Sequence, residues 1–327
     1  MIRKQTKLSD KIFRKDIEMV PTRQGYGEGL VEAGKKDERV VVLCADLSES
    51  TRSQWFQQKF PDRFIELGVA EQNMATVASG LANYGKIPFI SSYATFSPGR
   101  NNEQIRTTIC INNVPVKIAG AHAGISVGPD GATHQALEDA GLMRMLPNMT
   151  VLVPCDAVEA RKATLVAAQL PGPVYIRFGR EKSAIVTTED TPFEVGKAQI
   201  FREGRDVAII SAGMLVYNAL LAAEELSKEG IEAMVINSPS LKPFDVETVM
   251  EAAKKTGAVV SVEEHQIVGG LGSAVAETLA QRYPVPQEFV GVNDRFGESG
   301  EPDELLEAFG MGVGSIVEAV KKVISRK

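Results

Sequence analysis

Cysteine and histidine are scarce in this chain, and long apolar runs are absent. Its three cysteines among 327 residues lie in or beside apolar runs without metal-ligand spacing, which predicts buried free thiols in a reducing compartment. No segment approaches the roughly 18 apolar residues that span a bilayer, and the first residues lack the apolar core of a signal peptide. We therefore expect a cytoplasmic protein.

The chain also lacks an excess of positive charge. It carries 36 lysines and arginines against 42 aspartates and glutamates, a net charge of −6. A nucleic-acid-binding protein needs a basic surface for the phosphate backbone, so we expect no nucleic-acid partner, although single arginines can still bind a small anion. The length and a hydrophobic fraction of 44% suffice for two domains with a core each.

Short β-rich runs alternate with helical patterns through the first 190 residues. Apolar runs predict strands over 40–44, 88–92, 116–119, 151–153 and 174–178. Apolar residues at helical spacing predict helices over 71–84, 101–111, 137–145 and 157–168. Near-continuous apolar strands separated by helices are typical of a mainly parallel sheet that is covered on both faces.

A second series of strands and helices follows the polar stretch 181–205. Strands are predicted over 207–211, 233–237, 258–262 and 289–292, and helices over 215–228, 246–255, 271–282 and 315–324. We predict two α/β domains, residues 1–190 and residues 191–327, each with a mainly parallel sheet and helices on both faces.

Two of the three histidines lie on one glycine-rich loop. The loop runs from His122 to His134, with Asp130 between them, and it follows an apolar run at 114–119. Its glycines and its proline exclude regular structure. Open α/β sheets bind their ligands at the carboxyl ends of the strands, so these side chains are candidates for a functional site.

Two other chemistries fit parts of this loop. The segment Gly124-Ile-Ser126-Val-Gly128 matches the serine nucleophile pattern of α/β-hydrolases. However, the Gly-Pro pair at 128–129 cannot continue the helix that must follow such a serine. His122, Asp130 and His134 are alternative ligands for zinc or iron, although their spacing matches no compact ligand motif.

A glutamate stands at the start of a small, apolar helix. Glu71 follows Leu67-Gly-Val-Ala and precedes Ala75, Val77 and Ala78. A carboxylate in a first turn can serve only the helix dipole, but the small apolar neighbours predict close packing around it. A carboxylate buried in this way is suited to share a proton with a ligand.

These segments together resemble the carboxyl-terminal half of a transketolase. The matching blocks are Gly68-Val-Ala-Glu71-Gln-Asn-Met, Tyr93-Ala-Thr-Phe96, His122, Gly128-Pro-Asp130-Gly-Ala-Thr-His134-Gln, Leu146-Pro-Asn-Met and Arg177-Phe-Gly-Arg180. The resemblance begins near Thr22 and continues through the rest of the sequence. It implies a pyrimidine-binding domain for thiamine diphosphate, followed by the family's carboxyl-terminal domain.

The resemblance also implies roles toward the cofactor. Glu71 would hydrogen-bond the aminopyrimidine ring of thiamine diphosphate and favour the imino tautomer, which takes the proton from the thiazolium carbon. Phe96 would stack on the same ring, and Asp46 would lie near the cofactor. The electron-sink chemistry belongs to the cofactor, and the protein supplies its position and tautomer.

Further roles concern the donor sugar. The resemblance implies that His122, Asp130 and His134 contact the hydroxyls and the carbonyl of a ketose, with His134 also a proton donor or acceptor. Glu71 and the two histidines are thus the candidate catalytic residues. The residues implied for the sugar phosphate are Arg23, Ser50 and Arg180. The planar donor fork of arginine suits a phosphate group.

One part of a whole transketolase is missing from this sequence. The family's amino-terminal domain binds the diphosphate through a Gly-Asp-Gly motif, which does not occur here. We therefore expect the carboxyl-terminal subunit of a split transketolase, with magnesium and the diphosphate held by a separate amino-terminal subunit. Because the family's sites lie between subunits, we also expect a two-fold heterotetramer with two copies of each chain.

Other functions stay open. The beta subunit of a 2-oxo acid dehydrogenase has the same length and domains, but its small unphosphorylated substrates would leave the arginines and the second histidine without a task. Deoxyxylulose phosphate synthase shares the Asp-Gly-x-Thr-His block. A regulatory paralogue without catalysis is the third alternative, which the joint presence of Glu71, His122, Asp130 and His134 disfavours.

Overall fold

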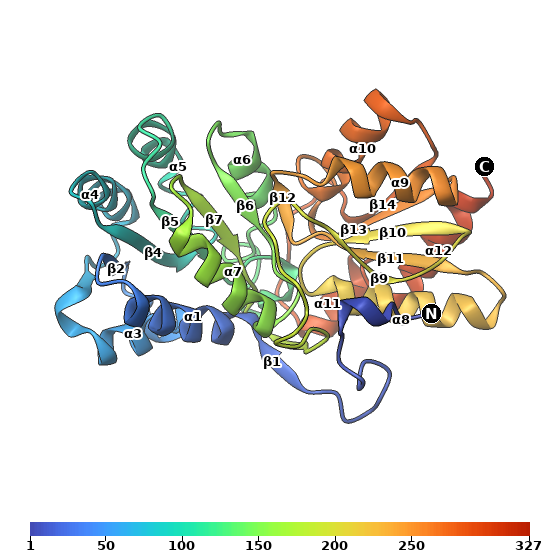
Figure 1. Cartoon of the computed structure of the whole chain (residues 1–327), viewed down its shortest axis with the longest axis horizontal. Helices are drawn as coiled ribbons and strands as arrows, with labels where there is room; N and C mark the ends of the chain where they lie inside the picture. Colours follow the sequence, from blue (N-terminus) through green and yellow to red (C-terminus); the bar gives the residue numbers. More distant parts are fainter.

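Two twisted sheets, each between layers of helices, form the two halves of the molecule. The computed structural model describes all residues from 1 to 327. In Figure 1 the first half, coloured blue to green, lies on the left apart from its blue amino-terminal segment, and the second half, yellow to red, lies on the right. The predicted fold class, two α/β domains with mainly parallel sheets, is confirmed.

The first sheet has seven strands in the order β12-β6-β7-β5-β4-β2-β3. The six strands from the first half are β2 (Val40–Cys44), β3 (Phe64–Glu66), β4 (Ile87–Tyr93), β5 (Lys117–Ala121), β6 (Thr150–Leu152) and β7 (Val174–Arg177). These six pair in parallel. Apart from the edge strand β3, these strands are buried on both faces, which explains why their sequences are mostly apolar.

Helices cover both faces of the first sheet. One face packs on α1 (Thr22–Lys36), α3 (Gln54–Lys59) and α7 (Ala157–Gln169). The other face packs on α4 (Glu71–Asn83), the π-helical turn η3 (Ile105–Cys110) and α6 (Asp139–Met145). Short connecting elements are α2 (Ser48–Thr51), η2 (Pro61–Arg63), α5 (Asn102–Gln104) and the 3-10 segment η4 (Ile125–Asp130).

The second sheet has five strands in the order β14-β13-β10-β11-β9. They are β9 (Gln199–Arg202), β10 (Val207–Ser211), β11 (Ala233–Asn237), β13 (Val259–Gln266) and β14 (Gln287–Val292), and only β9 is antiparallel to its neighbour. Helices α8 (Leu215–Lys228), α11 (Pro302–Ala308) and α12 (Val313–Ile324) pack on one face. Helices α9 (Val246–Thr256) and α10 (Leu271–Arg282) pack on the other.

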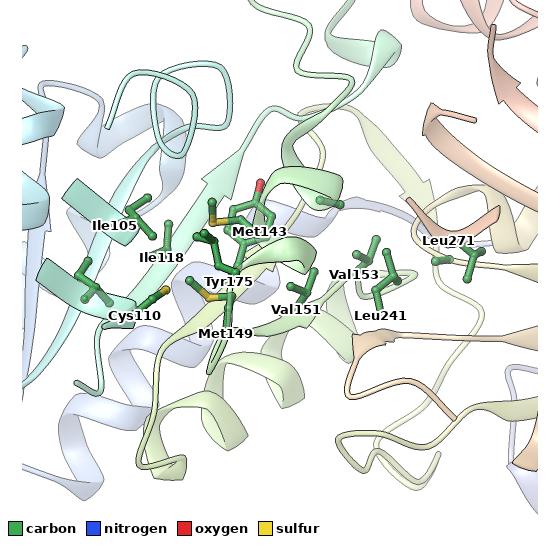
Figure 2. Packing of buried hydrophobic residues seen from close by; sticks show 14 of the residues in the cluster. Ile105, Cys110, Ile118, Met143, Met149, Val151, Val153, Tyr175, Leu241 and Leu271 are labelled. Atoms are coloured by element: carbon green, nitrogen blue, oxygen red, sulfur yellow. The ribbon is translucent and has the colours of Figure 1, made fainter. Parts of the chain in front are cut away.

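The two halves are joined by shared elements. Strand β12 (Ser240–Lys242) leaves the second half and pairs antiparallel with β6 in the first sheet. One apolar cluster extends through both halves, and Figure 2 shows it running from Ile105 and Ile118 past Tyr175 to Leu241 and Leu271. The two sheets are therefore held by one continuous core.

The amino-terminal segment lies against the second half of the chain. The amide of Arg3 donates to the carbonyl of Phe201 at 3.0 Å, and Ile12 is buried in the core of the second sheet. The segment contains the short turn η1 (Lys4–Thr6), and β1 (Met19–Pro21), which pairs with β8 (Lys182–Ala184), leads back to the first half. Figure 1 places the amino terminus beside α8. The domain boundary near residue 190 stays a prediction.

Two local differences separate the observed elements from the predicted ones. The helix predicted over 101–111 is the short α5 followed by the π-helical turn η3, and the helix predicted from 137 begins at Asp139. No helix of the structure combines the length and the apolar character that crossing a membrane requires.

Candidate active site

The predicted site residues gather at the carboxyl edge of the first sheet. His122 directly follows β5, and Tyr93 is the last residue of the neighbouring strand β4. Arg180 follows β7 by three residues, and Asp46 follows β2 by two. The carboxyl ends of parallel strands meet at one edge, so segments far apart in the sequence reach the same region.

The histidine loop has a backbone that only a few residue types adopt readily. His122 itself has a positive φ of 53°, and Gly124, Gly128 and Gly131 have φ values of 97°, 77° and 74°. Glycine adopts such angles without steric cost, whereas a positive φ is uncommon for histidine. Six other non-glycine residues of the chain also have a positive φ, so the angle fixes the direction of the His122 side chain without marking its function by itself.

Aromatic rings bring the two loop histidines together. Tyr93 stacks on His122, with ring centroids 4.0 Å apart. Phe96 meets His134 edge-on, with centroids 5.5 Å apart, and it also stacks on Tyr93 at 6.0 Å. Phe96 has a role implied by the family resemblance, whereas Tyr93, in the same sequence block, was given none. The pairing of Tyr93 with Ala121 places this ring next to His122, and that pairing appears only in the folded sheet.

His122 is a neutral, buried imidazole. It is 2% exposed, and its Nε2 lies 3.3 Å from Nη1 of Arg23. Burial first, and then the positive charges of Arg23 and Arg180, lower the pKa of His122 to about 3. Because a guanidinium only donates hydrogen bonds, Nε2 accepts and the ring hydrogen lies on Nδ1. That Nδ1 is buried and has no partner in the protein, so it can donate to a ligand.

Arginines concentrate positive charge beside His122. Arg23 donates from Nη1 to the carbonyl of Ser50 at 3.0 Å, and Arg180 donates to the carbonyl of Val127 at 2.9 Å. Burial, together with the nearby charges of Arg52 and Arg180, lowers the pKa of Arg23 from its ordinary value. Arg52 was not singled out from the sequence. Guanidinium groups that repel one another in this way favour a bound anion.

Asp130 and His134 lie at the outer end of the loop. Asp130 Oδ2 is 3.4 Å from Nη1 of Arg180, which brings two of the predicted residues into contact. His134 is half-buried, and its Nδ1 lies 2.9 Å from the hydroxyl of Thr133. The structure thus joins Arg23, Ser50, His122, His134, Asp130 and Arg180 in one connected region.

Glu71 begins α4 and is almost completely enclosed. It is 1% exposed, and its Oε2 accepts a hydrogen bond from Nη1 of Arg100 at 2.6 Å. Its Oε1 is buried without a partner. The guanidinium of Arg100 also lies over the ring of Phe96, 4.8 Å from the centroid. Arg100 was missed as a site residue, since nothing in its local sequence marks it as the partner of a carboxylate 29 residues earlier.

Asp46 lies apart from these contacts. It is exposed, has a φ of 58°, and donates its backbone N–H to Oε1 of Glu66 at 2.8 Å. Its side chain makes no hydrogen bond to the other predicted residues. Its position near a cofactor stays a prediction.

The two alternative chemistries lack structural support. Ser126 is fully buried, and its hydroxyl faces the sulfur of Met214 at 3.4 Å rather than a histidine, which is the wrong environment for a hydrolase nucleophile. No three histidine, cysteine, aspartate or glutamate side chains lie close enough together to hold a metal ion. The loop therefore fits the binding of a polar ligand better than either alternative.

Comparison with known proteins gives consistent matches along the chain. The family model for the transketolase pyrimidine-binding domain matches residues 18–184, and that for the transketolase C-terminal domain matches residues 196–316. The 6-deoxy-6-sulfo-D-fructose transketolase subunit SqwH of Clostridium sp. (strain MSTE9) is 44% identical over 305 residues, covering 93% of this chain and 95% of the relative.

Two further matches cover nearly the whole chain. One of the subunits of the apulose-4-phosphate transketolase of Phocaeicola vulgatus is 34% identical over 94% of this chain and 99% of the relative. Among solved structures, a split gene transketolase described as an inactive beta4 tetramer superposes with a TM-score of 0.88 at 49% identity, covering 94% of this chain and 99% of that one.

Proposed function

Because the chain belongs to the transketolase family, we propose that it is the carboxyl-terminal subunit of a two-chain transketolase. It would transfer a two-carbon ketol unit from a ketose phosphate to an aldose phosphate, and only together with an amino-terminal subunit. The observation that carries this proposal is the convergence of a buried glutamate, two histidines and two arginines at one sheet edge. Each of these groups has a task in that reaction.

The surroundings of Glu71 fit the pyrimidine ring of thiamine diphosphate. The buried, unpartnered Oε1 of Glu71 is a hydrogen-bonding atom that still needs a partner, and the half-buried Phe96 beside it offers an aromatic face. Glu71 would hold the ring and share a proton with it, and Phe96 would stack on it. A ring stacked on the face now covered by Arg100 would displace that guanidinium. When bound, the cofactor supplies the carbanion-stabilising chemistry.

The histidine loop is suited to the donor sugar. Neutral His122 has an Nδ1–H free to donate to a sugar oxygen. His134 is half-buried and packs edge-on against Phe96. It would give a proton to the substrate or take one from it. Exposed Asp130 would accept from a hydroxyl.

The arginines favour a donor with an anionic end. Arg23 and Arg180, with Ser50 beside them, would bind the phosphate of the ketose. The names of two relatives support an acidic terminal group, since one acts on a sulfonated ketose and the other on a phosphorylated one. A terminal sulfonate is therefore the second candidate for the substrate.

The division into subunits follows from what this sequence does not contain. The family's diphosphate motif, Gly-Asp-Gly, does not occur in this sequence, and we propose that the amino-terminal subunit holds diphosphate and magnesium. A heterotetramer with two copies of each chain would complete the site.

Reconstitution tests this function directly. The purified chain is assayed with thiamine diphosphate, magnesium, a ketose phosphate and an aldose phosphate, first alone and then with an amino-terminal subunit that carries Gly-Asp-Gly. We expect activity only in the mixture, and activity of the isolated chain would contradict the split-subunit proposal. Parallel assays with pyruvate test the dehydrogenase alternative, and assays with a sulfonated ketose test the second substrate class.

A further inference from the structure

One carboxylate of the second domain reaches the histidine loop of the first. Glu264, in β13, is 4% exposed, and its Oε1 accepts a hydrogen bond from the backbone N–H of Ser126 at 2.6 Å. We propose that Glu264 is a positioning residue for donor binding: it fixes the loop so that His122 and His134 face the same substrate. The proposal rests on the proposed function for the identity of that substrate.

The fit of Glu264 against the loop is close. Gly124, two residues after His122, has no side chain, and a Cβ at this position would collide with the Glu264 carboxylate. The φ of Gly124 is 97°, which also favours glycine. The carboxylate therefore occupies the space beside the loop backbone, and any displacement of Glu264 leaves the amide of Ser126 buried without its partner.

Arg177 keeps Glu264 in place and bonds to the far end of the loop. Its Nη2 donates to the backbone carbonyl of Glu264 at 2.8 Å and to that of Ala136 at 3.3 Å, while its Nε donates to Asp139 at 2.9 Å. Burial raises the pKa of Glu264, and the charge of Arg177 opposes that rise. The guanidinium of Arg177 thus connects β13 to the residues that directly follow the histidine loop.

A second contact from the same domain supports the loop independently. The side-chain amide of Gln135 donates to the carbonyl of Ile125 at 3.0 Å and to the carbonyl of Glu298 at 2.9 Å. Glu298 belongs to the segment between β14 and α11. The histidine loop is therefore held between the two domains, whereas the side chains that hydrogen-bond to Glu71 are Arg100 and Asn101 of the first domain. We infer an effect on donor binding and none on cofactor binding.

Three variants separate positioning from general damage. Glu264→Ala removes the acceptor, Glu264→Gln keeps an oxygen that can accept from Ser126, and Glu251→Ala is a control on the exposed face of α9. Hydrogen exchange of peptides covering 122–135 is measured on the purified chain. We expect exchange at Ser126 to rise about tenfold or more in Glu264→Ala, and to stay close to the original chain in the other two. Unchanged exchange in Glu264→Ala overturns the proposal.

The reconstituted enzyme supplies the functional measurement. In Glu264→Ala the KM for the ketose phosphate should rise about tenfold, with the Kd for thiamine diphosphate unchanged and with rescue in Glu264→Gln. An unchanged KM, or an equal loss of cofactor affinity, overturns the proposal. If Glu264→Ala does not fold, Glu264→Asp replaces it in both measurements. Its side chain is shorter by one methylene group, which moves the carboxylate away from the amide of Ser126. If the unmodified enzyme has no transketolase activity, the proposed function fails, and the exchange measurement still decides the positioning.

Discussion

Arg100 donates a hydrogen bond to one oxygen of Glu71 at 2.6 Å, while the other oxygen of the same carboxylate is buried and has no protein partner. This asymmetry divides the carboxylate into a held side and a free side. The held side fixes the orientation of the group at the start of α4. The free side is available to a ligand.

Replacing Glu71 with glutamine should abolish proton sharing without disturbing the fold. Glutamine keeps the shape and an oxygen that can accept from Arg100, but it cannot exchange a proton with a ring nitrogen. We expect kcat of the reconstituted enzyme to fall by about 10² to 10⁴, while size-exclusion chromatography shows unchanged assembly. Glu103→Gln, at the exposed position of α5, is the control. Full activity of Glu71→Gln would favour the regulatory paralogue instead.

Loss of the Arg180 guanidinium should weaken binding of anionic donors selectively. A hydrogen bond to a charged group contributes about 1.5 to 3 kcal/mol, so we expect the KM for a ketose phosphate to rise at least about tenfold in Arg180→Ala. The KM for the corresponding unphosphorylated ketose should not change. Arg205→Ala removes a mostly exposed charge elsewhere and serves as the matched control. Equal effects on both sugars would argue against an anion site.

His122 should remain neutral well below neutral pH. Its pKa of about 3 in the folded chain lies below the unfolded value of about 6.5, so between these values the unfolded chain binds more protons and stability falls as the pH is lowered. The slope approaches about 1.4 kcal/mol per pH unit. Nitrogen NMR at about pH 5 should show a neutral ring, and His122→Asn should reduce the acid-side loss of stability. A cationic ring at that pH would contradict the structure.

Glu159 should give the opposite pH dependence. It is buried at the domain junction, where its two oxygens accept from the amide of Cys155 and the side chain of Asn237, and burial together with Asp156 raises its pKa to about 7. Because the folded pKa exceeds the unfolded one, its contribution is fully present below about pH 4.3 and is lost as the pH rises toward 7.

Thermal unfolding of Glu159→Gln checks this sign. The variant should gain stability relative to the original chain as the pH rises from about 5 to 8, by up to about 1.4 kcal/mol per pH unit within the titration range. Between about pH 4.3 and 6.5, the titration of His122 raises stability with pH and that of Glu159 lowers it. Each variant is therefore compared with the original chain separately. A constant difference in Tm between the two chains at all pH values would contradict the assignment.

Local sequence patterns were enough to predict the fold class, whereas most of the site residues came from the family resemblance, and their roles stay predictions. Apolar strands covered on both faces and a glycine-rich loop after β5 leave clear local signals, and parallel topology then places His122 beside the residues that follow neighbouring strands. Contacts between distant segments leave no such signal. The contact between Arg100 and Glu71 joins residues 29 positions apart, and the contact between Glu264 and Ser126 joins residues 138 positions apart. The sequence around one residue of such a pair does not indicate which distant residue it contacts.

The same limit applies to backbone detail. The π-helical turn at 105–110 looks like ordinary helix in the sequence, because its apolar residues keep helical spacing. Strand β12 contributes three residues to a sheet formed otherwise by the first half. Such crossings depend on how whole layers pack, and a short apolar run does not reveal which sheet it joins.

The continuous apolar cluster between the sheets, together with β12, has a mechanical consequence. A hinge between the halves would have to separate buried side chains such as Val153 and Leu241 and peel β12 from its neighbour. Such opening would expose apolar surface to water at a cost of about 25 cal/mol per Å², so the shared core opposes hinge motion between the two halves. We therefore expect a ligand to reach the sheet edge by movement of loops and not by separation of the two halves.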